Sequence, residues 1–432
     1  MDCEPSQVRG QEQGAPCGYV NPMPRTSSFT CRAIARAVLL SVLLGIFSVA
    51  MAQSPESLVR LALSKREAVK SAESQLKAAR SAASSLGAYP ATRLEAGTAT
   101  RPDVSGGEDL TLFQPLDVFG KSRAAGRSAN ANVKVSEANL RQAQLNVQIE
   151  VLGAYAQWAN ASRNHRFALD QLEIVRKVEQ ATKARVEAKA LPELLSARAA
   201  LEVARAEQVV IDREAVLQIA LVKLRQVVGG EVPGLGESEP ESIAQGLIHV
   251  AKPERDRPEL AALLSQRRGF LSDAQQAKLS RLPDLELQAR RSPWSSQTEQ
   301  YGLRIQLVFP LWDHGAARKR ADSADQQADA ASLDYSDTLK RVQAEVEAAH
   351  IQLSASERSL TAYAKLLEGA QDLLRRTERG FELGANTLLD VLDAKRALDD
   401  ALEQSSNARQ NADLAVAAAL ASQGQILGES TR

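Results

Sequence analysis

Two segments of this chain alternate apolar and polar residues, the pattern typical of a β-strand with one apolar face. The first covers residues 284–291 and the second covers residues 301–311. One face of the second segment carries only large apolar side chains: Tyr301, Leu303, Ile305, Leu307 and Phe309. Residues 91–100 and 108–115 alternate less regularly and are separated by a proline and two glycines. The sequence therefore predicts two strand pairs, or four strands per chain.

Apolar residues at helical spacing fill most of the remaining chain. The predicted helices cover residues 57–85, 121–190, 192–228, 257–282, 319–379 and 388–422. Only Gly126 and Gly153 disfavour a helix within 121–190, and at ~1.5 Å per residue such a helix is on the order of 100 Å long. That length exceeds the width of an ordinary domain. The pattern indicates long antiparallel helix pairs with turns at 191–193 and 380–387.

A strand-to-helix hinge occurs twice, at residues 113–121 and 308–316. Each copy ends an alternating segment with Pro-Leu, passes one glycine and opens a long helix. Pro115 and Pro310 are 195 residues apart (310 − 115), and the same offset separates Gly120 from Gly315. Proline lacks the N–H that a strand ladder needs, so we expect it to end each strand, and glycine tolerates the backbone that redirects the chain.

The constant offset predicts two structurally equivalent halves. The fold expected is mainly α with a small β part, and each half runs helix, strand hairpin, long helix, return helix. We place a first structural repeat at 53–228, an inter-repeat linker at 229–256, a second repeat at 257–428 and a C-terminal tail at 429–432.

The first 52 residues have the features of a secretory signal peptide. Three arginines precede an apolar stretch at 37–49, and Ala50-Met51-Ala52 supplies the small-x-small cleavage pattern. We expect cleavage after Ala52 and a true start at Met23, with a retained anchor as the alternative. The chain's three cysteines all precede this site, so the mature protein would contain no disulfide, thiolate metal site or catalytic cysteine.

Composition and motifs exclude several classes of function. Lysine plus arginine number 53 and aspartate plus glutamate also number 53, so no basic excess points to nucleic acid. The four histidines, His165, His249, His314 and His350, lack metal-ligand spacing. The sequence also lacks a Walker A loop, a dinucleotide-binding glycine motif and a nucleophile elbow. We therefore expect no metal, no cofactor and no enzymatic activity.

An exported strand with an apolar face, a polar face and aromatic margins fits an outer-membrane β-barrel. The aromatic residues in question are Tyr89, Trp294, Tyr301, Phe309 and Trp312. A half-buried sheet in a soluble protein alternates in the same way and remains the alternative. Four strands cannot close a barrel and lipid does not tolerate open strand edges, so several chains would have to complete it. Three chains would supply twelve strands.

The hinge at 114–121, its copy at 309–311 and the turn at 384–394 together resemble the TolC-type outer-membrane efflux proteins. The resemblance covers essentially the whole mature chain in the same order. The segments Arg257-Pro258-Glu259-Leu260 and Arg185-Val186-Glu187-Ala188 are more similar to the CzcC-like branch associated with heavy-metal resistance.

The resemblance implies a homotrimer with a twelve-stranded barrel in outer-membrane lipid, continued across the periplasm by an α-helical barrel. It also implies a passive exit duct that is coupled to an inner-membrane pump through a periplasmic adaptor protein. The transported substrate is not specified by the sequence, and metal ions, drugs and proteins all stay open.

The resemblance also implies a gate at the periplasmic tip. Asp390 and Asp393 stand where related proteins carry a ring of acidic residues, and their spacing places them on one helix face. Both could instead be ordinary helix-start residues that interact with the helix dipole. Phe381 and Asn386 occupy the positions where some members latch the tip with tyrosine and arginine. They lack the phenol and the guanidinium, so the same latch is not expected.

A periplasmic adaptor or another exported coiled-coil scaffold would also contain long helix pairs. Adaptors carry one helical hairpin between two halves of a β-domain, whereas this chain is predicted to carry two hairpins, each preceded by its own strand pair. An enzyme is the third alternative. Membrane fractionation separates the efflux duct from the adaptor, because only the duct is expected as an outer-membrane trimer.

Overall fold

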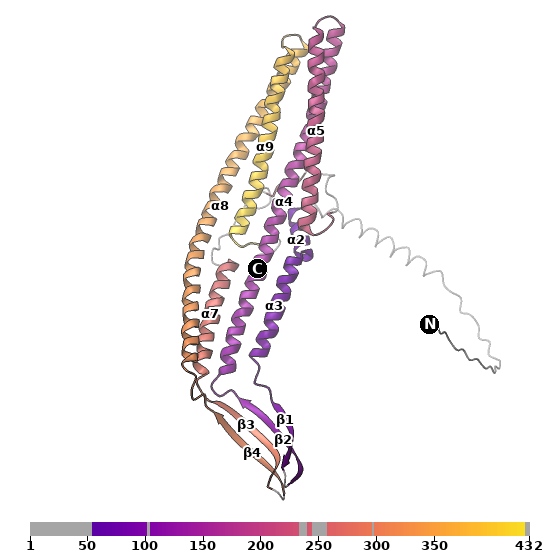
Figure 1. Ribbon diagram of the computed structural model, residues 1–432. Coiled ribbons are helices and arrows are strands. Elements are labelled where there is room, and N and C mark those ends of the chain that lie inside the picture. Colours follow the sequence, from indigo (N-terminus) through magenta and orange to yellow (C-terminus); the bar gives the residue numbers. More distant parts are fainter. Residues whose placement is uncertain (1–53, 102–103, 233–239, 244–256, 296–297, 428–432) are drawn as a thin grey trace, which may run out of the picture. The chain divides into compact units, whose positions relative to one another are not determined.

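Each half of the chain runs from helix through a strand pair into a long helix and back along a return helix (Figure 1). The computed structural model describes residues 54–101, 104–232, 240–243, 257–295 and 298–427, which belong to one unit, Met51–Arg432. The predicted signal peptide (1–52), the tail (429–432) and most of the predicted linker lie outside the described residues.

The described elements follow the same order in both halves. The first half contains α2 (Pro55–Lys65), α3 (Glu67–Leu86), β1 (Arg93–Arg101), β2 (Val104–Leu116), α4 (Lys121–Glu187) and α5 (Glu193–Val228). The second half contains α7 (Pro258–Leu279), β3 (Asp284–Ser295), β4 (Thr298–Val308), α8 (Ala316–Glu382) and α9 (Leu388–Ser422). The two long helices, α4 and α8, each have 67 residues.

The prediction of one continuous helix at residues 57–85 is wrong. Residues 57–85 do not form a single helix, because Arg66 adopts extended backbone (φ −64°, ψ 127°) between α2 and α3. Its side chain lies 2.6 Å from Glu150 of α4, so a contact distant in sequence stabilises the break. Gly126, in contrast, does not interrupt α4. A Cβ there would lie 3.0 Å from Gly87 Cα, so the missing side chain allows α3 to end close against α4.

The four strands form one antiparallel sheet in the order β1-β2-β3-β4. The two strand pairs join through β2 and β3, with Leu110 opposite Arg291 and Leu116 opposite Leu285. The sheet therefore contains one strand pair from each half, and β1 and β4 form its two edges.

Two expectations about the strand ends need correction. Pro115 does not end β2, which continues to Leu116 with Pro115 opposite Glu286. The ladder with β1 has already ended at Phe113, so Pro115 lies at an edge position, where proline is tolerated. In β4 the strand ends at Val308, so Phe309 lies outside it. Val308 pairs with Asp284, the first residue of β3. Residues after Val308 therefore have no residue of β3 to pair with.

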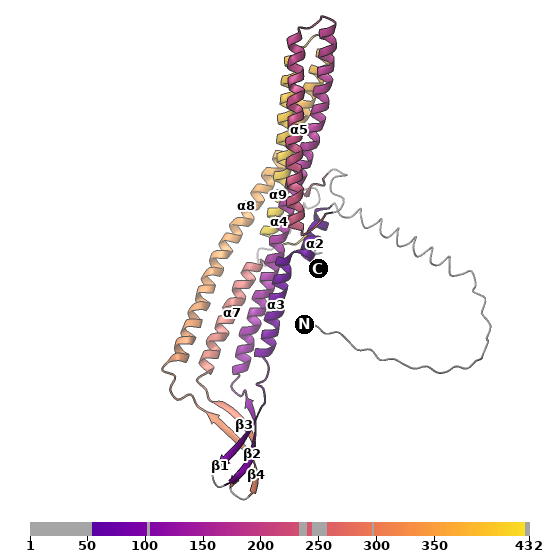
Figure 2. The same ribbon diagram turned by 45° about the vertical axis from the view of Figure 1, so that its right-hand side comes forward.

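The helices pack as two long antiparallel hairpins with shorter helices beside their lower parts (Figures 1 and 2). The long helix α4 packs against α3 along one part of its length and against α5 along the next. The long helix α8 packs against α7 and α9 in the same way. α4 also contacts α7 and α9, so it joins the two halves.

A central core lies where the return helices end. Its buried side chains include Leu152, Tyr155, Leu224 and Leu420, together with Ile243 from the predicted linker. Tyr155 donates its hydroxyl to Glu241 O at 2.9 Å. Burial away from water raises the pKa of Tyr155, which therefore stays a neutral hydrogen-bond donor.

The described end of the chain is fixed to the same core. Gln148 is fully buried, donates to Gln425 O at 2.9 Å and accepts the Leu427 N–H at 2.7 Å. A buried amide that satisfies two backbone groups holds this segment in one place. Residues 240–243 and 425–427 are therefore part of the folded core rather than loose connections.

Candidate functional site

The turn between α8 and α9 forms the tip of the second hairpin. Gly384 has left-handed backbone (φ 78°), and the N–H groups of Ala385 and Asn386 donate to Gly380 O at 2.8 and 3.1 Å. The Asn386 side chain donates to Thr377 O at 3.2 Å. It also covers Gly380, where an added Cβ would lie 2.3 Å from Nδ2. Asn386, a candidate gate residue, thus closes the turn against the end of α8.

Asp390 forms a capping box at the start of α9. Its carboxylate accepts the Thr387 hydroxyl and the Thr387 N–H, both at 2.7 Å, and Thr387 Oγ1 accepts the Asp390 N–H at 3.3 Å. Hydrogen bonds from the Thr387 hydroxyl and then from its N–H lower the pKa of Asp390, because they favour the charged form. The residue therefore acts as a helix-start residue, whatever further role it has.

Asp393 follows three residues later on the exposed side of α9. Its side chain is exposed, and Oδ1 lies 3.1 Å from Arg396 Nη1. Exposed pairs of this kind contribute only about 0–1 kcal/mol, so the ion pair leaves the carboxylate available to other cations. The structure thus brings the two candidate acidic residues together on one helix face.

Phe381 links the two hairpins at the tip. Its ring is buried, and Arg185 Cζ, from the last turn of α4, lies 4.5 Å from the ring centroid. The same guanidinium donates from Nη2 to Glu382 O at 2.6 Å. A cation over an aromatic face is attracted by the ring quadrupole. Local sequence pattern did not indicate this contact, since the two residues belong to different halves.

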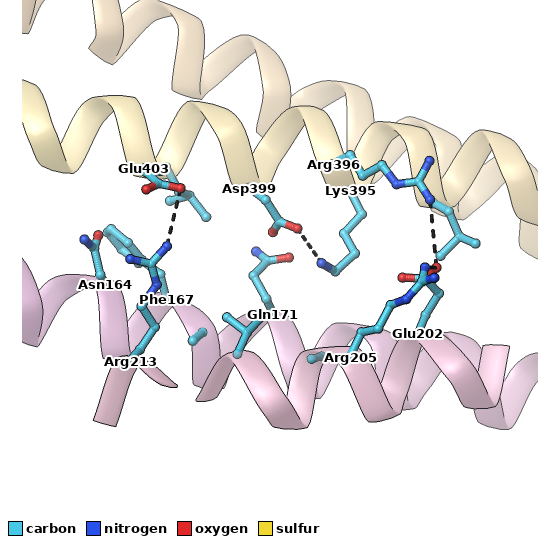
Figure 3. Close-up of a pocket in the computed structure, with 15 residues that line it drawn as sticks. Asn164, Phe167, Gln171, Glu202, Arg205, Arg213, Lys395, Arg396, Asp399 and Glu403 are labelled. Atoms are coloured by element: carbon cyan, nitrogen blue, oxygen red, sulfur yellow. Dashed lines mark hydrogen bonds and ion pairs between the residues drawn. The ribbon is translucent and has the colours of Figure 1, made fainter. Parts of the chain in front are cut away.

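A groove of about 320 Å³ lies between α9 and the first hairpin, formed by α4 and α5 (Figure 3). Two ion pairs cross it, Arg213 with Glu403 at 3.4 Å and Arg396 with Glu202 at 3.8 Å. Both are partly exposed, and such pairs contribute only about 0–1 kcal/mol each to stability.

Between these two ion pairs, α9 carries the Lys395–Asp399 pair (Figure 3). Burial raises the pKa of Asp399, and the hydrogen bond from Lys395 opposes that change. Gln171 of α4 points toward this pair, and its Oε1 accepts no hydrogen bond from the described residues. In the middle of the groove, polar groups of α4 and α9 therefore face each other, and the Gln171 Oε1 atom makes no hydrogen bond to α9 within the described residues.

The opposite ends of the long helices hold the two hinges. Gly120 and Gly315 are the N-cap residues of α4 and α8, with φ values of 76° and 77°. A nearby aspartate completes each cap: Asp117 accepts the Ser122 N–H at 3.2 Å, and Asp313 accepts the Ala317 N–H at 3.1 Å. The predicted hinge glycines thus occupy equivalent left-handed positions that residues with a Cβ rarely adopt.

The apolar face of the sheet extends across all four strands. In register, Leu94, Leu112, Ala289 and Leu303 form one row from β1 to β4. Leu94 is 65% exposed, Leu303 81% and Ile305, one row away, 68%. No described helix packs against this face. The sheet consequently presents a broad apolar surface that its own chain leaves uncovered.

The other face of the sheet is polar and bonded across strands. Arg93 of β1 lies 2.8 Å from Glu286 of β3, and Gln288 donates to Gln306 on β4 at 2.5 Å. Aromatic side chains lie exposed at the helical end of the strands, where Phe309 is 58% exposed and Trp312 84%. Trp294, also predicted as a marginal aromatic, has a side chain outside the described part.

Two observations apply to residues 54–101, 104–232, 240–243, 257–295 and 298–427. Within these ranges no cluster of three or more His, Cys, Asp or Glu residues could hold a metal ion. None of the described helices combines the length and apolar character needed to cross a membrane.

The family model described as "Outer membrane efflux protein" matches the chain twice, over residues 58–230 and 253–425. The chain belongs to this family. The two matched segments begin 195 residues apart and end 195 residues apart (253 − 58 and 425 − 230), the offset found between the hinges. The predicted resemblance to TolC-type proteins is thereby confirmed, and this family member resides in the outer membrane and extends into the periplasm.

Individual relatives agree with the family assignment. The outer membrane protein TolC of Vibrio cholerae is 28% identical over 321 residues, covering 67% of this chain and 72% of the relative. The cobalt-zinc-cadmium resistance protein CzcC of Cupriavidus metallidurans is 27% identical over 299 residues, covering 66% of this chain and 69% of the relative. Since the two identities are nearly equal, the CzcC-like branch stays a prediction.

A solved structure supports the fold. The outer membrane protein VceC of Vibrio cholerae superimposes with a TM-score of 0.71 at 19% identity, covering 86% of this chain and 96% of VceC. The mainly helical fold with a small sheet is therefore that of known outer-membrane channels.

Proposed function

We propose that three copies of this chain assemble into a passive exit duct of a tripartite efflux or secretion system. Their sheets would form a twelve-stranded barrel in outer-membrane lipid, and their helices would continue it as an α-helical barrel in the periplasm. A periplasmic adaptor would connect the duct to an inner-membrane pump, which would supply the energy. The protein itself would not be an enzyme.

The uncovered apolar face of the sheet carries this proposal. In water a surface that includes Leu94, Leu303 and Ile305 at more than half exposure would be unfavourable, whereas lipid covers it at no such cost. The sheet also ends in two edges, β1 and β4. Unpaired strand edges are not tolerated in lipid, so the same arrangement requires other copies to close a barrel.

Exposed apolar side chains along the helices support assembly with further copies. Leu194, Leu201, Ile211, Ile219 and Val222 of α5 are all more than half exposed. On α8, Leu333 and Ile351 are 69% and 61% exposed. Extended apolar stripes of this kind are typical of surfaces that bind other chains. We assign them to the contacts between neighbouring copies in the helical barrel.

The tip is the proposed gate. In a trimer, the exposed carboxylates of Asp390 and Asp393 would number six around the periplasmic mouth, favouring cations and resisting approach of the three chains. The contact of Arg185 with Phe381 and with Glu382 O holds the two hairpins of one chain together at the same level. We propose that breaking this contact accompanies opening of the mouth.

Membrane fractionation and single-channel recording test the proposed function together. The full-length protein should appear in the outer membrane as a heat-resistant trimer and conduct ions after reconstitution into planar bilayers. A soluble or inner-membrane monomer would refute the duct and favour the adaptor alternative. Loss of the trimer after Ile219→Lys on α5, with retention after Lys223→Gln on the same helix, would assign α5 to the contact between copies.

A further inference from the structure

Arg257 lies where three helices of the second half meet. It is the N-cap residue of α7, with extended backbone (φ −62°, ψ 129°), and its side chain is 8% exposed. Nη1 donates to Ala421 O in the last turn of α9 at 3.0 Å, and Nη2 lies 2.9 Å from Glu345 Oε2 on α8. The Glu259 carboxylate of α7 lies 3.1 Å from Nη2. One guanidinium therefore joins α7, α8 and α9.

The Arg257 contacts cross a joint between two helices that meet end to end. Just after α9, Gly424 turns the chain with left-handed backbone (φ 69°), and a Cβ there would lie 3.6 Å from Pro258 Cδ and 3.7 Å from Arg257 Cδ. α8 passes this joint without interruption, while its neighbours α9 and α7 stop and start (Figure 1). A long helix can bend gently, so the hairpin of α8 and α9 can tilt relative to α7 at this joint.

The first half contains the same joint with fewer bonds. Arg66 is the N-cap residue of α3 and pairs with Glu150, which is 195 residues before Glu345. Gly229, 195 residues before Gly424, ends α5 with φ 85°, and a Cβ there would lie 3.4 Å from Lys65 Cβ. The described contacts of Arg66 include no hydrogen bond to α5. Within the described residues, therefore, the arginine at this joint binds the end of the return helix in the second half and not in the first.

The two long helices, α4 and α8, also differ in how much they contribute to the central apolar core at this level. The central core takes buried side chains from α4, α5 and α9, whereas α8 contributes only the partly buried Leu353. An interlocked apolar core resists displacement, because it loses many contacts at once. Directional hydrogen bonds to one guanidinium can instead break and re-form after a small rotation. The end of α9 is thus part of the central core, whereas α8 buries Val342 and Val346 outside that core and is joined to the end of α9 through Arg257.

We propose that Arg257 is the pivot of the second hairpin. By binding Glu345 and Ala421 O together, it positions the α8–α9 hairpin on α7 and so determines how far the tip lies from the first hairpin. Arg257 is a positioning residue, remote from the pore mouth. Its link to duct opening rests on the proposed function, whereas the mechanical coupling between joint and tip does not.

Hydrogen exchange on the intact, detergent-solubilised protein tests this coupling. In Arg257→Gln, backbone amides of the tip turn (383–387) and of the α9 terminus (419–423) should exchange at least about tenfold faster, because the hairpin loses the bonds that join it to α7. Amides of β3 should not change. Arg257→Lys should give an intermediate effect, since an ammonium replaces the charge but not the guanidinium's forked geometry.

Two matched controls make the result specific. Arg66→Gln removes the equivalent arginine of the first half, and Arg341→Gln removes the exposed arginine 3.9 Å from Glu345. Neither should change exchange at 383–387. In single-channel recordings Arg257→Gln should lengthen openings, while the two controls should not.

Three results would overturn the pivot. If amides near 419–423 exchange faster in Arg257→Gln while those of the tip turn (383–387) do not change, Arg257 stabilises only the end of α9. An equal effect of Arg66→Gln on the tip of the second hairpin would remove the asymmetry. If Arg257→Gln does not fold, Arg257→Lys decides, and unchanged exchange at its tip would contradict the proposal. Absence of conductance with the expected exchange pattern would instead refute only the duct.

Discussion

Leu303 offers a direct test of whether the sheet faces lipid. It is the central residue of β4, its side chain is 81% exposed, and it ends the apolar row that begins at Leu94. In a barrel, Leu303→Arg would place a cation near the bilayer midplane at a cost of about 2–4 kcal/mol per chain. Three copies would raise this to roughly 6–12 kcal/mol per trimer. On a water-facing sheet, the same exposed substitution would change stability by only about 0.5 kcal/mol.

The assay is denaturant unfolding of the trimer in lipid vesicles, followed by its mobility in unheated gels. Gln306→Arg is the matched control on the opposite face, where loss of the hydrogen bond from Gln288 should cost about 1 kcal/mol. Leu307→Arg, near the end of β4, should cost less than Leu303→Arg, because the penalty falls toward the bilayer surface. Equal costs at Leu303 and Gln306 would refute a lipid-facing surface.

The remaining predictions concern the tip and the N-terminus. Replacing both Asp390 and Asp393 with asparagine should weaken cation selectivity and divalent block while trimers still form, and unchanged selectivity would place the constriction elsewhere. Because hydrogen bonds lower the pKa of Asp390, its cap stabilises the turn above the carboxyl's unfolded-state pKa. That stabilisation is lost as pH falls through the lower folded-state pKa, so the protection factors of the tip amides should fall on acidification, and those of the doubly substituted variant should change less. Phe381→Ala should cost about 3–5 kcal/mol in thermal unfolding and increase channel opening. Arg185→Gln should increase opening with a smaller loss of stability, and unchanged opening in both variants would exclude a latch. Sequencing of the exported protein should begin at Gln53, and a mature chain that retains a cysteine would contradict the proposed cleavage.

Features that depend on local geometry could be predicted from the sequence. Gly120 and Gly315 were identified from spacing alone, and both adopt the left-handed backbone for which glycine is suited. Alternation along 284–291 and 301–311 indicated the strands and their faces, because side chains in a strand alternate with period two. The 195-residue offset required only that the same local signals occur twice.

Contacts between distant segments could not be predicted in this way. Arg66 breaks a helix without any nearby proline or glycine, and its partner Glu150 is 84 residues away. The bond from Arg257 to Glu345 spans 88 residues, and the contact of Arg185 with Phe381 joins different halves. Helical periodicity indicates which side of a helix is buried, but not which residue of another helix it meets. The candidate gate residues therefore stay a prediction, while the arginine beside Phe381 was missed.

The equal length of α4 and α8 limits how this protein can change in evolution. Deleting one residue from α4 alone would shift everything beyond it by ~1.5 Å and rotate it by about 100°. Arg185 would then point away from Phe381, and Val178 would leave the shared apolar cluster at the tip. Insertions and deletions should therefore accumulate in the turns, or occur as matched pairs at positions 195 residues apart. A relative whose two long helices differ in length by one residue should carry a compensating bulge in one of them.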